Sequence, residues 1–111
     1  MGFRILTTIF TKTALIKDTE GEIIGRINLI DLDWITHTGA VGYRVGEKFT
    51  GKGIALKALE MLQSEAKLLG IKELHAKTAI DNIPSQKVLE KRFFQKVFVD
   101  KDKFIHYSLT L

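Results

Sequence analysis

One stretch decides the fold, and it occupies residues 40–80: AVGYRVGEKFTGKGIALKALEMLQSEAKLLGIKELHAKTAI. It opens with a β-rich segment, Ala40 to Val45, and continues through a glycine-containing loop. From Ile54 to Leu69, apolar residues recur every three or four positions, which places them on one face of a helix. Glu73 to Ile80 then alternates between apolar and polar residues, as a half-buried strand does. The stretch therefore predicts a strand–helix–strand unit, which favours a sheet covered by helices.

Shorter elements are predicted on both sides of this unit. β-rich runs bounded by turn residues predict strands, and Gly25 indicates a bulge or a close backbone approach. Asn82 and Pro84 are typical of a helix start, where a side-chain cap is followed by proline in the first turn. The order of elements predicts an α+β fold with a mixed, mostly antiparallel sheet. The predicted strands span Phe3–Phe10, Thr13–Lys17, Ile23–Leu32, Ala40–Val45, Glu73–Ile80, Phe94–Val99 and Phe104–Leu111, and the helices span Ile54–Leu69 and about 83–92.

The composition narrows the class of protein. A chain of 111 residues suits one domain, residues 1–111, in which residues 1–12 form an atypical N-terminal segment. The absence of cysteine excludes disulfides and thiolate metal sites, and three histidines without ligand spacing predict no metal. No apolar run suits a membrane span and no signal-peptide pattern is present, so we expect a cytoplasmic protein with no membrane partner. The net charge of +4 favours an anionic ligand but is too small to indicate nucleic acid.

The loop between the central strand and helix has the composition of an anion site. Residues 47–55 (EKFTGKGIA) lead into the helix N-terminus, where free backbone N–H groups and the helix dipole favour a negative charge. Gly51 and Gly53 allow an anion to approach the backbone, and Lys48 and Lys52 add positive charge. A phosphate is the natural ligand for such a loop. A plain turn explains the glycines equally well, and the loop matches neither the Walker A pattern nor the full GxGxxG pattern.

A set of motifs in a fixed order resembles one enzyme family. The motifs are Gly-Tyr-Arg-Val at 42–45, Thr-Gly-Lys-Gly-Ile-Ala at 50–55, Ala58-Leu59, Asn82-Ile-Pro-Ser85 and Val88-Leu-Glu-Lys91. With these motifs the chain resembles the GNAT superfamily of acetyl-CoA-dependent N-acetyltransferases over residues 13–111. It looks most similar to the subgroup that acetylates the N-termini of ribosomal proteins. The resemblance implies a central β-α-β-α-β-β core, acetyl-CoA as co-substrate, and a protein N-terminus or a small-molecule amine as acceptor.

The resemblance also assigns residues to the cofactor. It implies that the strand at 42–45 splays from the strand at 74–78, with the pantetheine arm between them and the pyrophosphate on the loop at 50–55. Asn82 is expected to touch the cofactor, and Ser85 is the expected catalytic residue, a general acid near the thioester sulfur. The cofactor-binding residues implied in this way are Tyr43, Arg44, Val45, Thr50, Gly51, Lys52, Gly53, Ile54, Ala55, Asn82, Ser85 and Lys91.

Several positions depart from the family pattern. Thr50 stands where Gln or Arg is common, Leu89 where many members have a tyrosine acid, and Ala40 where the subgroup has Glu. Phe93 replaces a glycine at a position expected to need a positive φ. The family's N-terminal strand and first helices, which form one wall of the acceptor pocket, are missing, so we expect an N-terminally shortened domain. An uncovered wall favours a homo-oligomer.

Other conspicuous side chains have plainer explanations. His37 is expected in solvent, and His75 is expected to pack in its strand. His106 and Tyr107 are expected in the last strand of the sheet. Trp34 is expected to plug the core, with a place at the lip of the acceptor site as the alternative. Basic residues are scattered along the chain, so nucleic acid is not expected as a partner.

Proton chemistry constrains the acceptor, because the attacking amine must be neutral. A lysine amine with a pKa near 10.4 is only about 0.04% neutral at pH 7, whereas an α-amine near 7.8 is roughly 14% neutral. No convincing general base is evident, so the sequence favours an α-amine; Glu47 or His75 acting as a base would reverse this preference. The alternative to an enzyme is a module that binds acetyl-CoA or CoA without catalysis.

Overall fold

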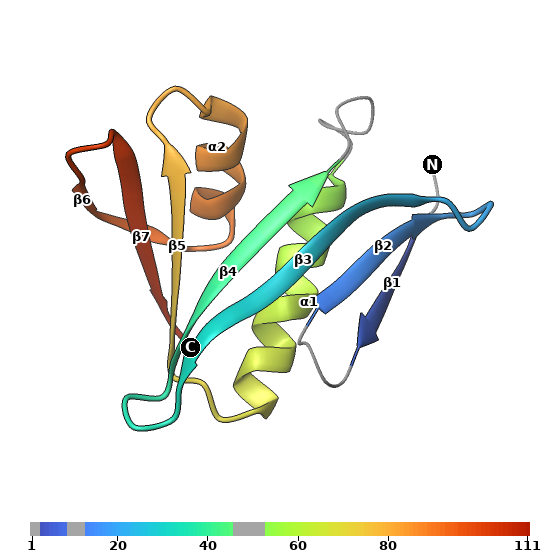
Figure 1. Cartoon of the computed structure of the whole chain (residues 1–111), viewed down its shortest axis with the longest axis horizontal. Coiled ribbons are helices and arrows are strands. Elements are labelled where there is room, and N and C mark those ends of the chain that lie inside the picture. The colour runs from blue at the N-terminus through green and yellow to red at the C-terminus, as the bar shows by residue number, and fades with distance from the viewer. Residues whose placement is uncertain (1–2, 9–12, 46–52) are drawn as a thin grey trace.

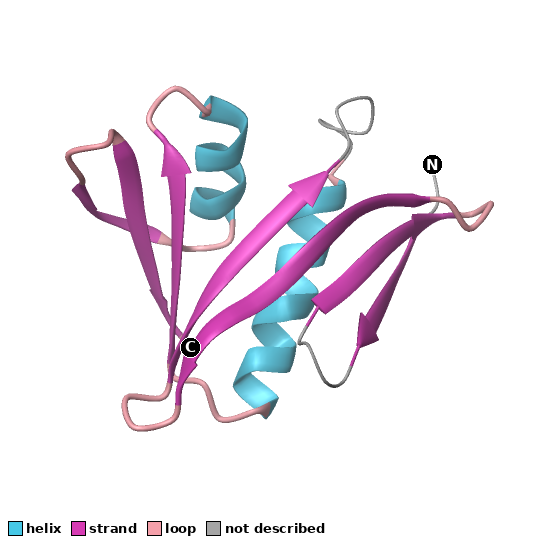
Figure 2. Ribbon diagram, in the orientation of Figure 1, coloured by secondary structure: helices cyan, strands magenta, loops and turns pink. Residues whose placement is uncertain are grey.

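A computed structural model of the chain describes residues 3–8, 13–45 and 53–111 and contains a seven-stranded sheet (Figures 1 and 2). The strand order is β1-β2-β3-β4-β5-β7-β6, and all neighbours are antiparallel except β4 and β5, which are parallel. This confirms the α+β prediction with a mixed, mostly antiparallel sheet. The elements are β1 (Phe3–Thr8), β2 (Thr13–Asp18), β3 (Ile23–Asp33), β4 (Thr38–Val45), α1 (Ile54–Leu68), β5 (Glu73–Ala79), α2 (Ile83–Lys91), β6 (Gln95–Val99) and β7 (Phe104–Thr110).

Element boundaries follow the predictions closely where local chemistry determines them. The extra N-terminal strand is confirmed as β1, and β4 begins at Thr38, two residues before the predicted start at Ala40. The bulge expected near Gly25 is also confirmed. Ile16 pairs with Gly25 while the next residue of β2, Lys17, pairs with Ile23, so β3 carries one extra residue there.

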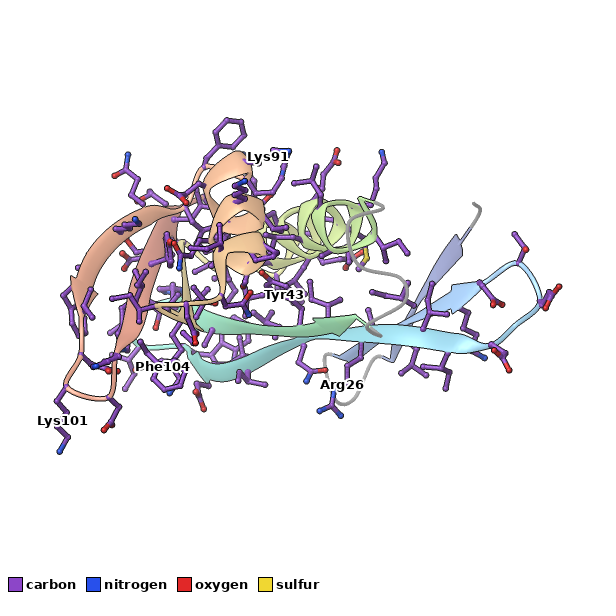
Figure 3. All side chains as sticks on the ribbon, turned by 90° about the horizontal axis from the view of Figure 1, so that it is seen from above. Arg26, Tyr43, Lys91, Lys101 and Phe104 are labelled. Atoms are coloured by element: carbon purple, nitrogen blue, oxygen red, sulfur yellow. The ribbon has the colours of Figure 1, made fainter. Side chains whose placement is uncertain are left out.

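Both helices pack on the same face of the sheet, as Figure 3 shows, and Arg26 and Phe104 lie on the opposite, open face. The apolar stripe predicted for the central helix is buried against the sheet. Burying each large apolar side chain contributes about 1.5–3 kcal/mol, so this shared core fixes α1 and α2 on one side. The buried residues that form it include Ile16, Ile27, Leu29, Val41, Ala58, Leu59, Leu62, Ala66, Leu74, Leu89, Ile105 and Tyr107.

Two aromatic expectations are corrected by the structure. Trp34 lies in the turn between β3 and β4 and is 51% exposed, so the expectation that it plugs the core is wrong. The turn is instead held by the Asp33 carboxylate, which accepts hydrogen bonds from the Ile35 and Thr36 backbone N–H groups. The side chain of His75 is half exposed on the open face, so the expectation that it packs in the sheet is also wrong.

His106 lies in the last strand, as expected, and it also contacts the Asp100 carboxylate and the Phe98 ring. His106 lies in β7, and its Nε2 atom is 2.8 Å from the Asp100 carboxylate at the β6–β7 turn. The Phe98 ring stacks on the imidazole with ring centroids 4.2 Å apart. The hydrogen bond from His106, and next the one from the Phe104 backbone, lower the pKa of Asp100. These contacts close the hairpin that flanks β5.

Both helices end in the same hydrogen-bonded motif. In α1, the Gly70 N–H donates to the Lys67 carbonyl and the Ile71 N–H donates to the Ala66 carbonyl, with Gly70 at φ 89°. This is the predicted left-handed glycine ending. It directs the chain from the helix back into β5.

In α2, a phenylalanine occupies the equivalent position. Phe93 has a φ of 76° and donates its N–H to the Glu90 carbonyl, while the Phe94 N–H donates to the Leu89 carbonyl. The positive φ expected at this position is confirmed. The Phe93 ring is 69% exposed and lies under the Arg92 guanidinium, 5.5 Å from the ring centroid. Few core contacts therefore offset the backbone strain.

Replacing Phe93 isolates this strain. Both Phe93→Gly and Phe93→Ala remove the ring, but only glycine adopts the left-handed conformation without steric cost. We expect Phe93→Gly to be about 1 kcal/mol more stable than Phe93→Ala in urea unfolding. Equal free energies of unfolding for the two variants would contradict a strained helix end.

Candidate active site

The strands β4 and β5 separate soon after they begin to pair. Only three residue pairs join them, from Thr38↔Glu73 to Ala40↔His75. Beyond this point the two strands diverge, and α2 stands beside the wide end (Figure 1). We call this region, between residues 41–45 of β4 and residues 76–79 of β5, the pairing gap. It matches the splay that the family resemblance implies for these strands.

The pairing gap is bounded by intact strand ladders. β4 stays paired with β3 as far as Val45↔Gly25, and β5 stays paired with β7 as far as Ala79↔Phe104. Along each strand, alternate residues direct their N–H and C=O groups to the other side. Some backbone groups of both strands therefore face the gap, and they need a partner other than a strand.

A short hydrogen bond connects β4 to the first turn of α2. The Tyr43 hydroxyl lies 2.6 Å from the Ser85 Oγ atom and also donates to the Ser85 carbonyl at 3.3 Å. Figure 3 shows Tyr43 between β4 and α2. Burial raises the pKa of Tyr43, and the hydrogen bond with Ser85 offsets only part of that increase. Tyr43 is therefore neutral near pH 7 and retains a proton that it can donate.

The first turn of α2 is held at the end of β5. Asn82 is its N-cap, and the side-chain oxygen accepts a hydrogen bond from the Ser85 N–H at 3.2 Å, as the sequence predicted. The buried Gln86 side chain donates to the Ala79 and Ile80 carbonyls at 3.4 and 2.9 Å. These contacts fix the position of Ser85 relative to both strands.

The start of α1 has the properties of an anion site. Gly53 is its N-cap with a φ of 75°, which favours glycine, and no side chain among the described residues caps the helix. The first turn contains no acidic residue. Within the described residues, no side chain therefore satisfies the first N–H groups of the helix, and the dipole makes this end positive. The approach of an anion to the Gly53 backbone, and with it the phosphate contact, stays a prediction.

The structure brings together some of the expected site residues and separates others. Tyr43, Asn82 and Ser85 lie together beside the pairing gap. Lys91 is exposed at the far end of α2, about 9 Å along the helix from Ser85, and on the side away from the sheet (Figure 3). In the first turn of α1, Ile54 is buried and Ala55 is half buried. For Arg44 and Val45 the structure describes only the backbone, which lies in β4. Thr50, Gly51 and Lys52 lie outside the described residues.

Sequence reasoning did not assign Gln86 and Tyr107 to this region. Gln86 is buried by its contacts with the end of β5, and nothing in its sequence position distinguishes it from an exposed helix residue. Tyr107 was expected only as a strand residue, and its alternation with Ile105 indicates the covered face of the sheet. Within the described ranges, no group of His, Asp or Glu side chains suits a metal ion, and no helix is long and apolar enough to cross a membrane.

Comparison with known proteins identifies the family. The chain matches the acetyltransferase (GNAT) domain family over residues 4–95. It therefore belongs to that family, in which acetyl-CoA is the general co-substrate. Comparison with curated proteins gives no match.

Solved structures agree with this fold. A structure described as a probable acetyltransferase is 26% identical with a TM-score of 0.81, and the alignment covers 88% of this chain and 61% of that chain. Ribosomal-protein-S5-alanine acetyltransferase from Vibrio fischeri is 24% identical with a TM-score of 0.78, covering 88% and 60%. RimJ from Mycobacterium smegmatis, in complex with CoA-disulfide, is 21% identical with a TM-score of 0.72, covering 88% and 52%. The chain spans about three fifths of the length of the first two structures.

Proposed function

We propose that this protein transfers an acetyl group from acetyl-CoA to an amine. The observation that carries the proposal is the pairing gap, where parallel pairing stops at Ala40↔His75 and leaves backbone groups without strand partners. Membership of the acetyltransferase (GNAT) family supports the same reaction class. Within the structure, the Tyr43–Ser85 pair lies beside the gap and provides hydroxyl groups for proton transfer.

The residues present fit the proposed co-substrate. Backbone groups of β4 facing the gap suit the amide groups of a pantetheine arm, because both sides supply donors and acceptors. The start of α1 at Gly53, which no side chain of the described residues caps, suits the pyrophosphate. Lys52 and the rest of the loop at 50–55 remain assigned to the same phosphates by the family resemblance.

Ser85 and Tyr43 can act together in proton delivery. Acetyl-CoA supplies the acetyl group as a thioester, and its sulfur must gain a proton as it leaves. The Tyr43 hydroxyl can donate to the Ser85 Oγ atom, which leaves the Ser85 proton free for the sulfur. Tyr43 replaces that proton by turning its O–H from the Ser85 carbonyl to Oγ, because a phenol is a stronger acid than an aliphatic hydroxyl, and it regains a proton from solvent once CoA has left. Ser85 is therefore the proposed acid, and Tyr43 is the group that supplies it.

The proposed acceptor is an α-amine or another weakly basic amine. Among the described residues, the side-chain hydrogen bonds beside the gap come from neutral groups, namely Tyr43, Ser85, Asn82 and Gln86. Such groups position a substrate but do not deprotonate a lysine ammonium, which requires a stronger base. An α-amine is roughly 14% neutral at pH 7 and can react through proximity alone. Solvent then accepts the proton released by the amine.

A module that binds acetyl-CoA without catalysis is the second candidate. It is favoured by Leu89, a buried apolar residue at the position where the family resemblance expects a tyrosine acid. Release of CoA thiol from acetyl-CoA in the presence of a mixed set of amines separates the two functions. The homo-oligomer and the cytoplasmic location stay predictions from the sequence.

Gly53 tests the phosphate contact. We expect Gly53→Glu to weaken CoA binding at least about tenfold more than Gly53→Gln, measured by calorimetry. The two side chains have similar size and the same conflict with the positive φ, so their difference isolates the negative charge. Among the described residues, no atom beyond the chain neighbours lies within 4 Å of a Cβ at this position. Equal affinities for the two variants would show that no phosphate lies here.

The hydroxyl pair is tested by a double-mutant cycle. We expect Ser85→Ala to lower kcat about 100-fold while CoA affinity stays unchanged, as for loss of a general acid. Tyr43→Phe should lower kcat through the same step, so the double variant should be no slower than Ser85→Ala. Ser108→Ala, a serine substitution in β7, is the matched control. An unchanged kcat in Ser85→Ala would show that Ser85 is not the acid. If the loss of kcat in the double variant equals the product of the two single losses, the two hydroxyls act independently.

A further inference from the structure

Tyr107 carries a buried hydroxyl that the proposed mechanism does not use. The residue is 1% exposed and is among the largest fully buried side chains of the described residues. Within the described part of the chain, its hydroxyl oxygen has no hydrogen-bond partner. Buried hydroxyl groups in folded proteins almost always have a partner, because an unmade hydrogen bond is costly. The partner expected for this hydroxyl therefore lies outside the described residues.

The strand register places Tyr107 next to the pairing gap. Tyr107 in β7 pairs with Ala76 in β5, and Ala76 is the first residue of β5 after the last pair with β4. Tyr107 lies on the face covered by the helices, and its partners in the strand pairing are Ala76 of β5 and Lys96 of β6. Tyr107 is therefore one strand away from the pairing gap, beside the first residue of β5 that β4 no longer pairs.

The pKa of Tyr107 depends on groups in both α2 and β4. Burial raises the pKa of Tyr107, and the charge of Glu90 in α2 and the Tyr43 hydroxyl in β4 raise it further. Tyr107 therefore stays protonated and acts as a donor. Its neighbours also define the ligand, since Glu90 disfavours an approaching anion and the apolar surroundings disfavour a charged group. A neutral acceptor such as a carbonyl oxygen fits best.

We propose that the Tyr107 hydroxyl donates a hydrogen bond to a carbonyl oxygen of the acyl-pantetheine arm bound in the pairing gap. This inference rests on the proposed function and adds a residue from β7 to the binding site. It makes Tyr107 a binding residue for the neutral part of the co-substrate, distinct from the phosphate contacts at Gly53. The bond would also satisfy the one hydroxyl of the core cluster that lacks a partner among the described residues.

Tyr107→Phe tests the proposal through two measurements, the Tm of the free protein and the affinity for acetyl-CoA. Without ligand, the variant should have an unchanged or higher Tm, because the removed hydroxyl makes no hydrogen bond. With acetyl-CoA, its affinity by calorimetry should fall about threefold to tenfold. Tyr43→Phe is the matched control, and it should lower the Tm without ligand because it removes a hydrogen bond that is present. A tyrosine with a purely structural role would show a lower Tm and unchanged affinity, and that result would overturn the proposal.

Free CoA identifies the carbonyl involved. An equal loss of affinity for CoA and acetyl-CoA assigns the hydrogen bond to a pantetheine amide, whereas a loss for acetyl-CoA alone assigns it to the thioester. Unchanged affinity for both ligands overturns the proposal and points to a water molecule as the partner. If the wild-type protein binds neither ligand at millimolar concentration, the proposed function itself fails.

A measurement on the wild-type protein removes any dependence on how the variant folds. The chain contains two tyrosines, Tyr43 and Tyr107, so two Cζ signals are expected in a spectrum of protein labelled with ¹³C-tyrosine. Tyr43→Phe assigns them. We expect the Tyr107 signal to shift when acetyl-CoA saturates the protein. An unchanged Tyr107 signal at saturation would contradict a hydrogen bond to the ligand.

Discussion

The structure depends on the early end of parallel pairing between β4 and β5. Three residue pairs join the strands, and the remainder of each strand is held only by its other neighbour. This is stable because β3–β4 and β5–β7 are paired along the separated lengths, so the outer ladders replace the missing contacts. The two helices, packed on one face, hold the separated strands in place from above. A sheet paired throughout would leave no backbone groups for a ligand.

The polar groups around the pairing gap come from elements far apart in the sequence. Tyr43 belongs to β4, Ser85 to α2 and Tyr107 to β7, and the core beneath the helices brings them together. Gln86 fastens α2 to the end of β5, and Gln63 in α1 exchanges hydrogen bonds with Arg92 at the other end of α2. Because both ends of α2 are fixed, Ser85 is positioned by the fold rather than by its own contacts alone.

Local patterns in the sequence predicted most of the fold. The apolar spacing of α1, the Asn82 cap and the Gly70 ending are determined by neighbouring residues, so each could be inferred without tertiary information. The strand separation came only from the resemblance to a family, because no local pattern specifies where parallel pairing stops. Trp34 was placed in the core because it is large and aromatic, but it lies in a short turn, and its side chain stays exposed.

The candidate site was predicted less completely than the fold. Motif positions indicated Tyr43, Asn82 and Ser85, but the hydrogen bond between Tyr43 and Ser85 depends on the angle between β4 and α2. The unpaired hydroxyl of Tyr107 depends on the identity of every neighbour in the core, which a single sequence does not provide.

Residue-resolved amide hydrogen exchange in the free and CoA-saturated protein tests the central claim most directly. If the co-substrate occupies the pairing gap, CoA should slow the exchange of gap-facing amides within 41–45 and 76–79 at least about tenfold, while amides of the β1–β2 pair keep their rates. Saturation with CoA that leaves the exchange of both gap segments unchanged would contradict the account.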